Sequence, residues 1–440
     1  MKIVRIIARL NVGGPAKHVA WVTAGTRRAG HESVLVAGTV PPGEDDMSYF
    51  AAAQGVAPVV ISEMSREVSP KDALTVWKLY RLLRRERPDI IHTHTAKAGT
   101  VGRVAGLCYR WLTPAALVAR PRRVRFVHTY HGHIFHSYYG PLKTRLFLII
   151  ERLLARLATD RIVVISPQQY REIHEQFGIG RGAQFAVVPL GLDLSAYDDW
   201  AARRTRMRAE LGASDDELLV GIVGRLTEIK HHKLFLEAAA RCKAERERMN
   251  AQTARVRFLL IGDGHLRAAL EAQTHALGLT DDVVFTGLRA DPEYFYPALD
   301  VCALTSLNEG TPLTLIEAMA NARAVIATAV GGVVDLLGAP TDNANETAPF
   351  VICERGVSVR PNDAAAFARA LLELLDAPEL RHELGARGRE YVARQYTVER
   401  LLDDLLKLYD ELRPARREVA PVTDTNDMRR VGRAARVKGD

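Results

Sequence analysis

The feature that most constrains the fold of this chain is a regular alternation of short apolar runs with helical patterns. Apolar runs rich in Val and Ile and bounded by turn residues predict buried strands, and the amphipathic stretches between them predict crossover helices. We expect a first series of strands at Ile3–Arg9, Ser33–Ala37, Ile90–Thr93, Phe126–Tyr130, Arg161–Ile165 and Ala186–Pro189. We expect a second series at Leu218–Val223, Val256–Ile261, Val283–Thr286, Val301–Thr305, Ala324–Ala327 and Gly356–Val359. This alternation predicts parallel, doubly wound sheets, so we expect an α/β protein with two such domains.

The order of the elements also predicts where the domains begin and end. The first domain is expected over residues 1–192 and the second over residues 193–376, with the junction near Pro189–Asp193. A linker helix from Leu194 to about Leu211 would follow the junction. The stretch 377–412 is purely helical and comes after the last strand, so we expect it to pack back over the domains.

Composition places the chain among soluble globular proteins. It is 48% hydrophobic and long enough for two cores, and no apolar run reaches the roughly 18 residues that suggest a membrane-spanning helix. The four cysteines lie far apart without metal-type spacing, so we expect reduced thiols, no zinc site and a cytoplasmic location. The tail 413–440 carries eight basic and four acidic residues, and we expect it to be disordered.

Charge is distributed unevenly along the chain. The formal net charge is +8, but residues 1–192 alone contribute +14, and no acidic residue occurs from Ile90 to Ile150. A basic half suits an acidic partner, which leaves open phospholipid headgroups, a diphosphate-linked acceptor or nucleic acid. The alternative is that this positive charge serves only solubility, although acidic and basic residues would then be expected to be mixed along the chain.

The most informative motif is a pair of glutamates, Glu309 and Glu317, within Ser306–Met319. The motif follows a predicted strand and opens a helix at about Pro312, where proline is tolerated because its missing N–H would be unpaired in any case. Glu309 therefore belongs to the loop before the helix, beside free N–H groups that suit a sugar hydroxyl or a phosphate. Glu317 lies one to two turns into the helix, where its carboxylate can accept two hydrogen bonds from a ribose diol. Sugar, diphosphate and ribose together indicate a nucleotide-sugar, whereas a solvated helix face is the ordinary alternative.

Two more loops of the second series carry residues suited to this ligand. Gly224 ends a strand, and Arg225 and Lys230 follow across the turn to the next helix, so both cations can converge on one diphosphate. They would stabilise the charge that grows on the leaving phosphate. Gly262 and Gly264 follow the next strand and predict a tight turn near the nucleotide base, not a dinucleotide site. The chain has no Asp-X-Asp motif, so we expect no essential Mg²⁺ on the diphosphate.

The loops that follow strands of the first series carry a glycine pair and several histidines. Gly13 and Gly14 let the backbone approach a phosphate or sugar. The polar residues at the ends of two further strands are His92, His94 and Lys97 in one loop, and His128, His131 and His133 in the other. We expect hydroxyl recognition at this sheet edge, with two or three of the five histidines simply buried and satisfied. We expect no metal site, because His92 and His94 would point to opposite faces of the strand and no carboxylate accompanies them.

In combination these motifs resemble glycosyltransferase family 4, a family of retaining enzymes with the GT-B fold. The resemblance covers roughly residues 1–412. It rests on the ordered motifs Gly13-Gly14, His131-Gly132, Gly224-Arg225-Leu226 with Lys230, Gly262-Asp263-Gly264, and Glu309-Gly310-Thr311-Pro312-Leu313 to Glu317. The stretches around His92–Arg103 and His128–Phe135 are most similar to bacterial members that build capsular, exopolysaccharide or O-antigen chains on a lipid carrier. The resemblance implies two Rossmann-like domains facing each other across a cleft, with the C-terminal helices packing back.

The resemblance also implies roles for the matched residues. Gly14 would approach the reacting centre, and His131 would touch the donor sugar. The residues implied to bind the donor are Gly14, Gly224, Arg225, Lys230, Gly262, Glu309, Gly310, Thr311, Pro312, Leu313 and Glu317. The catalytic set would be His131, Glu309, Arg225 and Lys230, and the acceptor or sugar would meet His92, His94, Lys97 and His133. The anomeric configuration would be retained by attack on the front face, with the departing phosphate oxygen accepting the proton, so no enzyme nucleophile, metal or cofactor is expected.

Two departures from the family pattern concern loops. A glycine commonly follows the family's lysine, but His231 and His232 stand there, so helix packing or loop shape is expected to differ. Residues 338–349 resemble an insertion, which we expect to be an inert loop, with a role over the nucleotide or in contacts as the alternative.

The expected function is transfer of a sugar from a UDP-linked donor, with GDP as the main rival, to a glycan acceptor on a lipid diphosphate. The enzyme would act at the inner face of the cell membrane and contact anionic lipid through the basic stretch 90–150 and the segment Tyr138–Leu157. One alternative is a nucleotide-sugar epimerase or phosphorylase of the same architecture. Another is a non-catalytic protein that binds anions or nucleic acid, but this leaves Glu309 and Glu317 unexplained and lacks a recognised nucleic-acid motif, so we expect no nucleic-acid partner.

Overall fold

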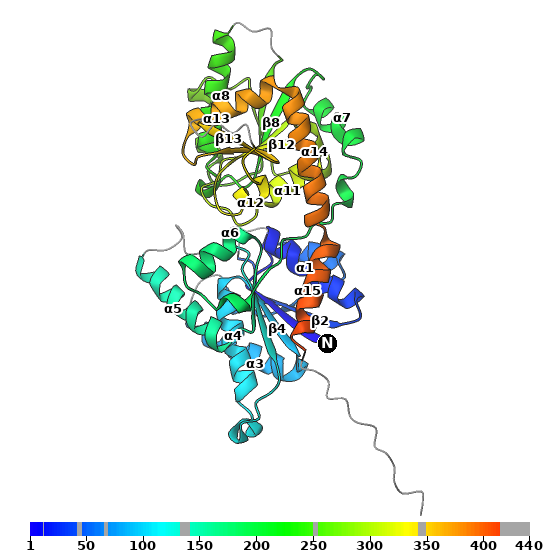
Figure 1. Ribbon diagram of the computed structural model, residues 1–440, viewed down its shortest axis with the longest axis vertical. Coiled ribbons are helices and arrows are strands. Elements are labelled where there is room, and N and C mark those ends of the chain that lie inside the picture. The colour runs from blue at the N-terminus through cyan, green and yellow to red at the C-terminus, as the bar shows by residue number, and fades with distance from the viewer. Residues whose placement is uncertain are drawn as a thin grey trace, which may run out of the picture.

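The computed structural model describes residues 1–11, 13–41, 46–65, 69–132, 141–249, 254–341 and 349–413. These residues form two α/β bodies stacked along the long axis of the molecule, each with helices on both faces of a central sheet (Figure 1). The expectation of two doubly wound sheets is therefore confirmed. Among the described residues, no helix combines the length and the apolar composition that a membrane span requires.

The N-terminal sheet is parallel throughout and has the strand order β3-β2-β1-β4-β5-β6-β7. Its strands are β1 (Lys2–Ile7), β2 (Glu32–Ala37), β3 (Val59–Val60), β4 (Ile90–His94), β5 (Arg125–Thr129), β6 (Arg161–Val164) and β7 (Phe185–Val187). Its helices and helical turns include α1 (Gly14–Arg28), α2 (Ser48–Ala53), α3 (Asp72–Glu86), α4 (Ala96–Trp111), η1 (Pro114–Val118), α5 (Pro141–Leu157), α6 (Pro167–Tyr170) and η2 (Arg171–Gln176).

The C-terminal sheet repeats this order as β10-β9-β8-β11-β12-β14-β13, with only the β13–β14 pair antiparallel. Its strands are β8 (Leu218–Val223), β9 (Val256–Ile261), β10 (Val283–Gly287), β11 (Val301–Leu304), β12 (Ala324–Thr328), β13 (Phe350–Cys353) and β14 (Gly356–Val359). Its helices are α7 (Trp200–Glu210), α8 (His232–Arg248), α9 (Arg267–Ala276), α10 (Pro292–Ala298), α11 (Leu313–Ala320), α12 (Val333–Leu337) and α13 (Ala364–Asp376).

The predicted strands match the observed ones closely, but two strands were not predicted. β3 has only two residues and lies at a sheet edge, which gives too short a pattern to recognise. β13 closes an antiparallel hairpin with β14 and follows the predicted insertion, of which residues 342–348 lie outside the described part of the chain. The predicted tail lies outside it as well from residue 414 onward.

The chain crosses between the two bodies twice, at neighbouring points. Leu192 donates its N–H to the carbonyl of Tyr396 at 2.8 Å, and Val398 donates to the carbonyl of Leu192 at 3.0 Å. Between the crossings, α14 (Pro378–Gln395) packs on the C-terminal body, and after the second crossing α15 (Val398–Glu411) packs on the N-terminal body (Figure 1).

Helix α15 supplies part of the N-terminal core. Leu401, Leu405, Leu408 and Tyr409 are buried together with strand residues such as Ile3, Ile90 and Val127. Their spacing of three and four places all of them on one face of α15. The C-terminal segment therefore completes the hydrophobic core of the first domain.

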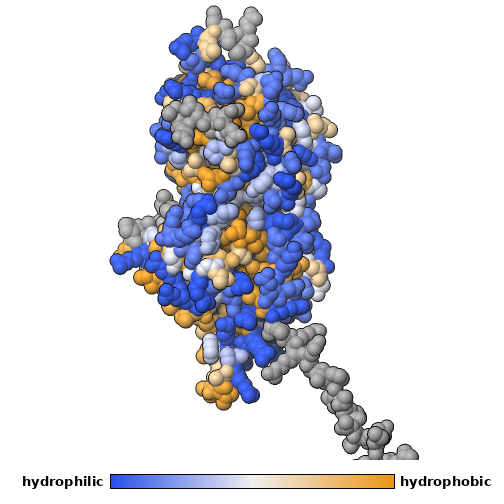
Figure 2. Space-filling model, in the orientation of Figure 1, coloured by the Kyte–Doolittle hydropathy of each residue, from blue (hydrophilic) through white to orange (hydrophobic). Residues whose placement is uncertain are grey.

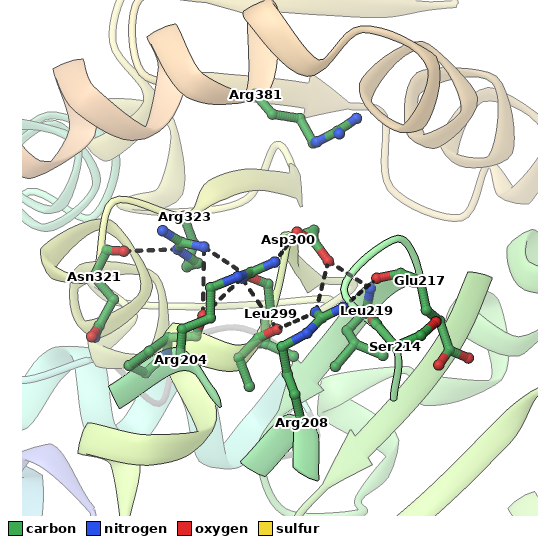
Figure 3. A network of polar contacts seen from close by, with 12 residues as sticks. Arg204, Arg208, Ser214, Glu217, Leu219, Leu299, Asp300, Asn321, Arg323 and Arg381 are labelled. Atoms are coloured by element: carbon green, nitrogen blue, oxygen red, sulfur yellow. Dashed lines mark hydrogen bonds and ion pairs between the residues drawn. The ribbon is translucent and has the colours of Figure 1, made fainter. Parts of the chain in front are cut away.

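Helix α7 is tied to the C-terminal sheet by arginines that surround Asp300 (Figure 3). Arg204 lies 2.6 Å from one oxygen of Asp300, and the buried Arg208 lies 3.4 Å from the other, which also accepts the N–H of Leu219 at 2.8 Å. Both arginines also donate to the carbonyl of Ala298, which would otherwise lack a partner at the end of α10. The network therefore fixes α7, at the start of the second domain, to the residues that directly precede β11.

In each sheet the first three strands are added toward one edge and the next strand starts the other half. This reversal of strand order lies between β1 and β4 in the first sheet and between β8 and β11 in the second. In open α/β sheets, ligands bind outside the carboxyl ends of the strands at such a switch point. The loops that follow β1, β8 and β11 contain the glycine pair, Gly224 to Lys230, and Glu309, whereas His92 and His94 lie in the last residues of β4 itself and Lys97 lies in the first turn of α4.

Candidate active site

The loops of the two sheets meet at the boundary between the domains and enclose a cleft of about 200 Å³. The residues that line it are His131, Gly132, Gln169 and Glu172 from the first domain, and Asn308, Glu309, Gly310 and Gly332 from the second. The contact is close: a Cβ added at Gly310 would lie 2.9 Å from the carbonyl oxygen of His131. His131 and Glu309, predicted from separate motifs, therefore face one cleft.

Two helix N-termini face each other beside this cleft. α1 begins at Gly14 and α11 at Leu313, and a Cβ added at Gly14 would lie 2.9 Å from Cδ1 of Leu313. Within the described parts of the chain, neither helix has a side-chain cap or an acidic residue in its first turn, so the N–H groups of both first turns are available to a ligand. The helix predicted to open at about Pro312 has that proline as its N-cap. Such termini attract anions, and a diphosphate is suited to the start of α11.

The Glu309 loop is held by an ion pair and by two glycines. Oε1 of Glu309 lies 2.5 Å from Nζ of Lys230 and accepts a hydrogen bond from Oγ of Ser306 at 2.6 Å. Gly331, with φ of 50°, packs so closely that an added Cβ would lie 1.8 Å from the carbonyl oxygen of Glu309. Gly332 donates its N–H to the carbonyl of Gly310 at 2.8 Å. Only glycine fits at Gly331, because the left-handed backbone and the close contact both exclude a side chain.

The glycines of the second-domain loops have a packing function. A Cβ at Gly262 would lie 2.1 Å from the carbonyl oxygen of Gly224, and one at Gly264 would lie 2.5 Å from the carbonyl oxygen of Leu226. The two loops therefore stack backbone to backbone, which explains the tight turn predicted at Gly262. The aliphatic stem of Lys230 passes within 3.6 Å of the Cβ position of Gly224, while the side chain of Arg225 is exposed.

Glu317 is buried at the domain boundary, on α11. It accepts a hydrogen bond from the hydroxyl of Tyr296 at 2.9 Å, and Nζ of Lys17 from the first domain lies 3.6 Å from its other oxygen. Burial and this carboxylate together raise the pKa of Tyr197 as well as that of Tyr296. A ribose diol bound to Glu317 would therefore compete with Lys17 for the carboxylate.

The histidines of the first domain fall into buried and cleft-facing groups. His92, His94 and His128 are fully buried, and His92 has both ring nitrogens hydrogen-bonded, to the hydroxyls of Tyr409 and Thr129 at 2.7 Å each. Nδ1 of His94 lies 3.0 Å from Nε2 of His131, which faces the cleft. His92 is a satisfied core residue, and His94 supports a residue of the cleft.

The expectation that His92 and His94 point to opposite faces of the strand is wrong. Their ring centroids lie 4.2 Å apart. Residues i and i+2 of a strand share one face, and both rings therefore stand on the same side of β4. Two further residues, Lys97 and His133, were predicted to meet the acceptor or sugar. Lys97 forms an ion pair with Asp72 at 2.6 Å, and His133 lies outside the described residues.

His18 on α1 was not predicted as a site residue, because a single histidine on an apolar helix face gives no distinctive pattern. It is buried, its ring lies 4.7 Å from that of His131, and neither of its nitrogens has a hydrogen-bond partner among the described residues. Ligand atoms of His18, His94 and His131 lie within 4.8 Å of one another, so these three rings could hold a metal ion. Burial lowers the pKa of His131 to about 4 and keeps the pKa values of His18 and His94 well below the usual range, so the rings are neutral near pH 7.

The remaining residues that sequence reasoning missed are polar groups on short elements. Gln169, Glu172 and Asn308 line the cleft, and the N–H of Gln168 donates to Asp335 of the second domain at 2.8 Å. None of them belongs to a motif that sequence alone would single out.

His231 explains how the loop tolerates the missing glycine. Its backbone has φ of 51° and ψ of 43°, which is the left-handed conformation that glycine adopts without strain. The loop therefore has a backbone conformation that suits glycine, and the Cβ of His231 makes this conformation less favourable than it would be for glycine.

Comparison with known proteins assigns both halves of the chain. Residues 12–196 match the family described as Glycosyltransferase Family 4, and residues 203–391 match the family described as Glycosyl transferases group 1. The chain is 25% identical over 343 residues to an Escherichia coli UDP-Gal:alpha-D-GlcNAc-diphosphoundecaprenol alpha-1,3-galactosyltransferase, covering 78% of this chain and 80% of that protein. It is 29% identical over 336 residues to a D-inositol 3-phosphate glycosyltransferase of Salinispora arenicola, covering 73% and 68%.

Solved structures share the arrangement of both domains. Anabaena HepE in complex with UDP superposes with a TM-score of 0.72 at 19% identity, covering 93% of this chain and 100% of that one. Sucrose-phosphate synthase from Thermosynechococcus elongatus gives a TM-score of 0.70 at 22% identity, covering 94% and 99%. The chain therefore belongs to the glycosyltransferases, with a family 4 domain followed by a group 1 domain in the GT-B fold.

Proposed function

We propose that this glycosyltransferase moves a sugar from a UDP-linked donor to a glycan acceptor carried on a lipid diphosphate, in the synthesis of a surface polysaccharide. The observation that carries the proposal is the cleft that Glu309 and Gly310 line, because Glu309 is paired with Lys230 and the uncapped start of α11 follows three residues after Gly310. The choice of donor is supported by HepE, whose structure contains UDP. The acceptor is supported by the E. coli relative, which is named for a diphosphoundecaprenol substrate.

In this proposal the donor lies across the second domain. The diphosphate binds at the start of α11, where Lys230 and Arg225 neutralise its charge as the bond to the sugar breaks. Glu309 accepts hydrogen bonds from sugar hydroxyls, aided by backbone N–H groups from Gly310 to Leu313, and Glu317 accepts those of the ribose. Gly262 shapes the wall of the nucleotide site by its contact with Gly224.

The first domain completes the reacting centre. The backbone at Gly14 approaches the donor, and His131 contacts the donor sugar as a neutral imidazole, because burial holds its pKa at about 4. The acceptor hydroxyl attacks from the face that the diphosphate leaves, a departing phosphate oxygen takes its proton, and the anomeric configuration is retained. Because Lys230 and Arg225 would neutralise the diphosphate, we propose that transfer requires no metal ion.

The proposal predicts a donor-dependent gain in stability. UDP-, GDP-, ADP- and TDP-sugars should be compared by thermal shift on the wild type, on Glu317→Ala and on Glu383→Ala, an exposed control. A ligand at a hundred times its Kd adds about 2.7 kcal/mol to stability. UDP-sugars alone should stabilise the wild type and the control, and the effect should be lost in Glu317→Ala. Stabilisation by a different nucleotide would overturn the choice of UDP.

A transfer assay tests the chemistry. Labelled sugar should pass from the UDP donor to a lipid-diphosphate acceptor, NMR of the product should show the donor's anomeric configuration, and EDTA should leave the rate unchanged. Inversion of configuration would contradict the front-face mechanism, and loss of activity in EDTA, restored by a divalent ion, would show that His18, His94 and His131 deserve study as a metal site.

A further inference from the structure

Helix α5 carries an exposed apolar stripe along its whole length. Leu142, Leu146, Ile149, Leu153 and Leu157 are each more than half exposed. Their spacing of four, three, four and four residues puts all five on one face of the helix. Figure 2 shows hydrophobic residues along the lower left edge of the N-terminal domain, where Figure 1 places α5. Isolated exposed leucines are ordinary on protein surfaces, but a continuous row of this length marks an interaction site.

The stripe is accompanied by positive charge only. Arg145, Arg152 and Arg156 are exposed beside it. The single acidic residue of α5, Glu151, is buried, where both its oxygens lie 2.7 Å from Arg103 and one of them accepts the hydroxyl of Tyr130. The solvent face of α5 therefore combines leucine and isoleucine with arginine and presents no carboxylate.

A cavity of about 420 Å³ adjoins the C-terminal end of the stripe and shares Arg156 and Leu157 with it. Three more arginines, Arg110, Arg161 and Arg181, line this cavity together with one carboxylate, Asp160. Arg110 and Arg161 have carboxylates at 3.5 and 3.7 Å. Within the part of the chain that the structure describes, Arg156 and Arg181 form no ion pair. The cavity thus offers guanidinium groups that a phosphate can bind in bidentate fashion.

The position of α5 links this surface to the cleft. Gly132 lines the cleft and the stripe starts at Leu142, so the start of the stripe lies within about 36 Å of the cleft by chain length alone. A second exposed apolar site, with Leu117 and Val118 on η1, projects from the same domain.

We propose that the exposed face of α5 docks on an anionic lipid bilayer, with the leucine stripe among the acyl chains and a lipid headgroup phosphate in the arginine-lined cavity. An amphipathic helix with arginines beside an apolar face has the composition of interfacial membrane helices. Contact with a second copy of the chain is disfavoured, because it would bring the arginines of both copies together. The inference rests on the proposed function, since a bilayer is where a lipid-linked acceptor would be met.

The test is co-sedimentation of the full-length protein with vesicles of phosphatidylcholine alone or with added phosphatidylglycerol. The wild type should bind the anionic vesicles. Leu146→Ser, Ile149→Ser and Leu153→Ser combined should weaken binding about a thousandfold, at roughly tenfold for each side chain withdrawn. Arg156→Gln with Arg181→Gln should reduce the preference for anionic over neutral vesicles about tenfold.

Matched controls come from the second domain. Met249→Ser with Leu288→Ser removes two exposed apolar side chains, and Arg248→Gln with Arg394→Gln removes two exposed charges. Both pairs should bind like the wild type. Wild-type binding by the triple variant, or failure of the wild type to bind either vesicle, would overturn the proposal. The proposal would also be overturned if the wild type bound no vesicle but formed a dimer in solution, and the triple variant were monomeric.

A short-chain, water-soluble acceptor diphosphate separates this inference from the proposed function. The α5 variants should transfer sugar to it at the wild-type rate. Vesicle binding by a wild type that transfers no sugar would overturn the proposed function and leave the docking surface standing. Loss of transfer to the soluble acceptor in the triple variant would place α5 in the active site and contradict the docking role.

Discussion

Nδ1 of His94 lies 3.0 Å from Nε2 of His131, so a buried residue at the end of β4 holds the histidine that faces the cleft. One ring donates and the other accepts, and the tautomer of one therefore determines that of its neighbour. The ring of His94 also packs against that of His92, at 4.2 Å between centroids, and the two nitrogens of His92 are hydrogen-bonded to Tyr409 and Thr129. The orientation of the cleft histidine is thus set by packing that begins at the C-terminal helix.

This relationship predicts the effect of His94→Phe. The kcat for sugar transfer should fall by about tenfold to hundredfold, because a reacting group displaced by about 1 Å loses a factor of this size. The donor KM should change little, and His94→Gln should recover part of the rate. The exposed His382→Ala is the control for steady-state kinetics. An unchanged kcat in His94→Phe would show that His131 needs no support from His94.

The buried histidines predict a dependence of stability on pH. Burial lowers the pKa of His131 to about 4 in the folded protein, against a usual value near 6.5 in the unfolded chain. The unfolded chain therefore binds more protons between these values, and stability falls as pH decreases from 6.5 towards 4. His131 contributes up to about 3 kcal/mol to this loss.

Urea unfolding at several pH values checks this dependence. Stability attributable to His131 should be constant above about pH 7, and His131→Gln should show a smaller loss in acid than the wild type. Equal pH dependence in both proteins would mean that His131 titrates normally in the folded state.

The left-handed backbone of His231 predicts a stabilising substitution. His231→Gly should raise the free energy of unfolding by about 1 kcal/mol, because glycine adopts this conformation without the clash of Cβ. Chemical denaturation measures the change, with the exposed His265→Gly expected to give no gain. A destabilised His231→Gly would indicate that the imidazole makes contacts worth more than the strain.

The network around Asp300 predicts a large loss of stability. Asp300→Ala leaves the buried guanidinium of Arg208 without its carboxylate and should cost about 3 kcal/mol. The exposed Asp215→Ala should be neutral, and both are measured by urea unfolding. A loss below 1 kcal/mol for Asp300→Ala would show that the carbonyls bonded to Arg208 suffice.

Much of this fold was predictable because the buried strands are continuous apolar runs. The bounds of β8, β9 and β14 match the prediction residue for residue, since turn residues flank each of them. β3 was not predictable, because two residues show no period, and β13 was missed because its antiparallel pairing interrupts the alternation.

The candidate site was predictable where backbone chemistry is unusual. Glu309 stood out because the glycine, threonine and proline that follow it suit only a special loop. Lys17, His18 and Tyr296 were not predictable, because their positions depend on how two domains meet and no local pattern records that contact.

The packing of α15 on the first domain has a consequence for synthesis of the chain. The first domain leaves the ribosome before the second, yet Leu401, Leu405 and Tyr409, which cover its core, are made only after the second domain. Domains usually fold in the order in which they emerge. Here the first domain cannot close its core until α15 has also emerged, so a chain that stops short of residue 409 leaves that core open.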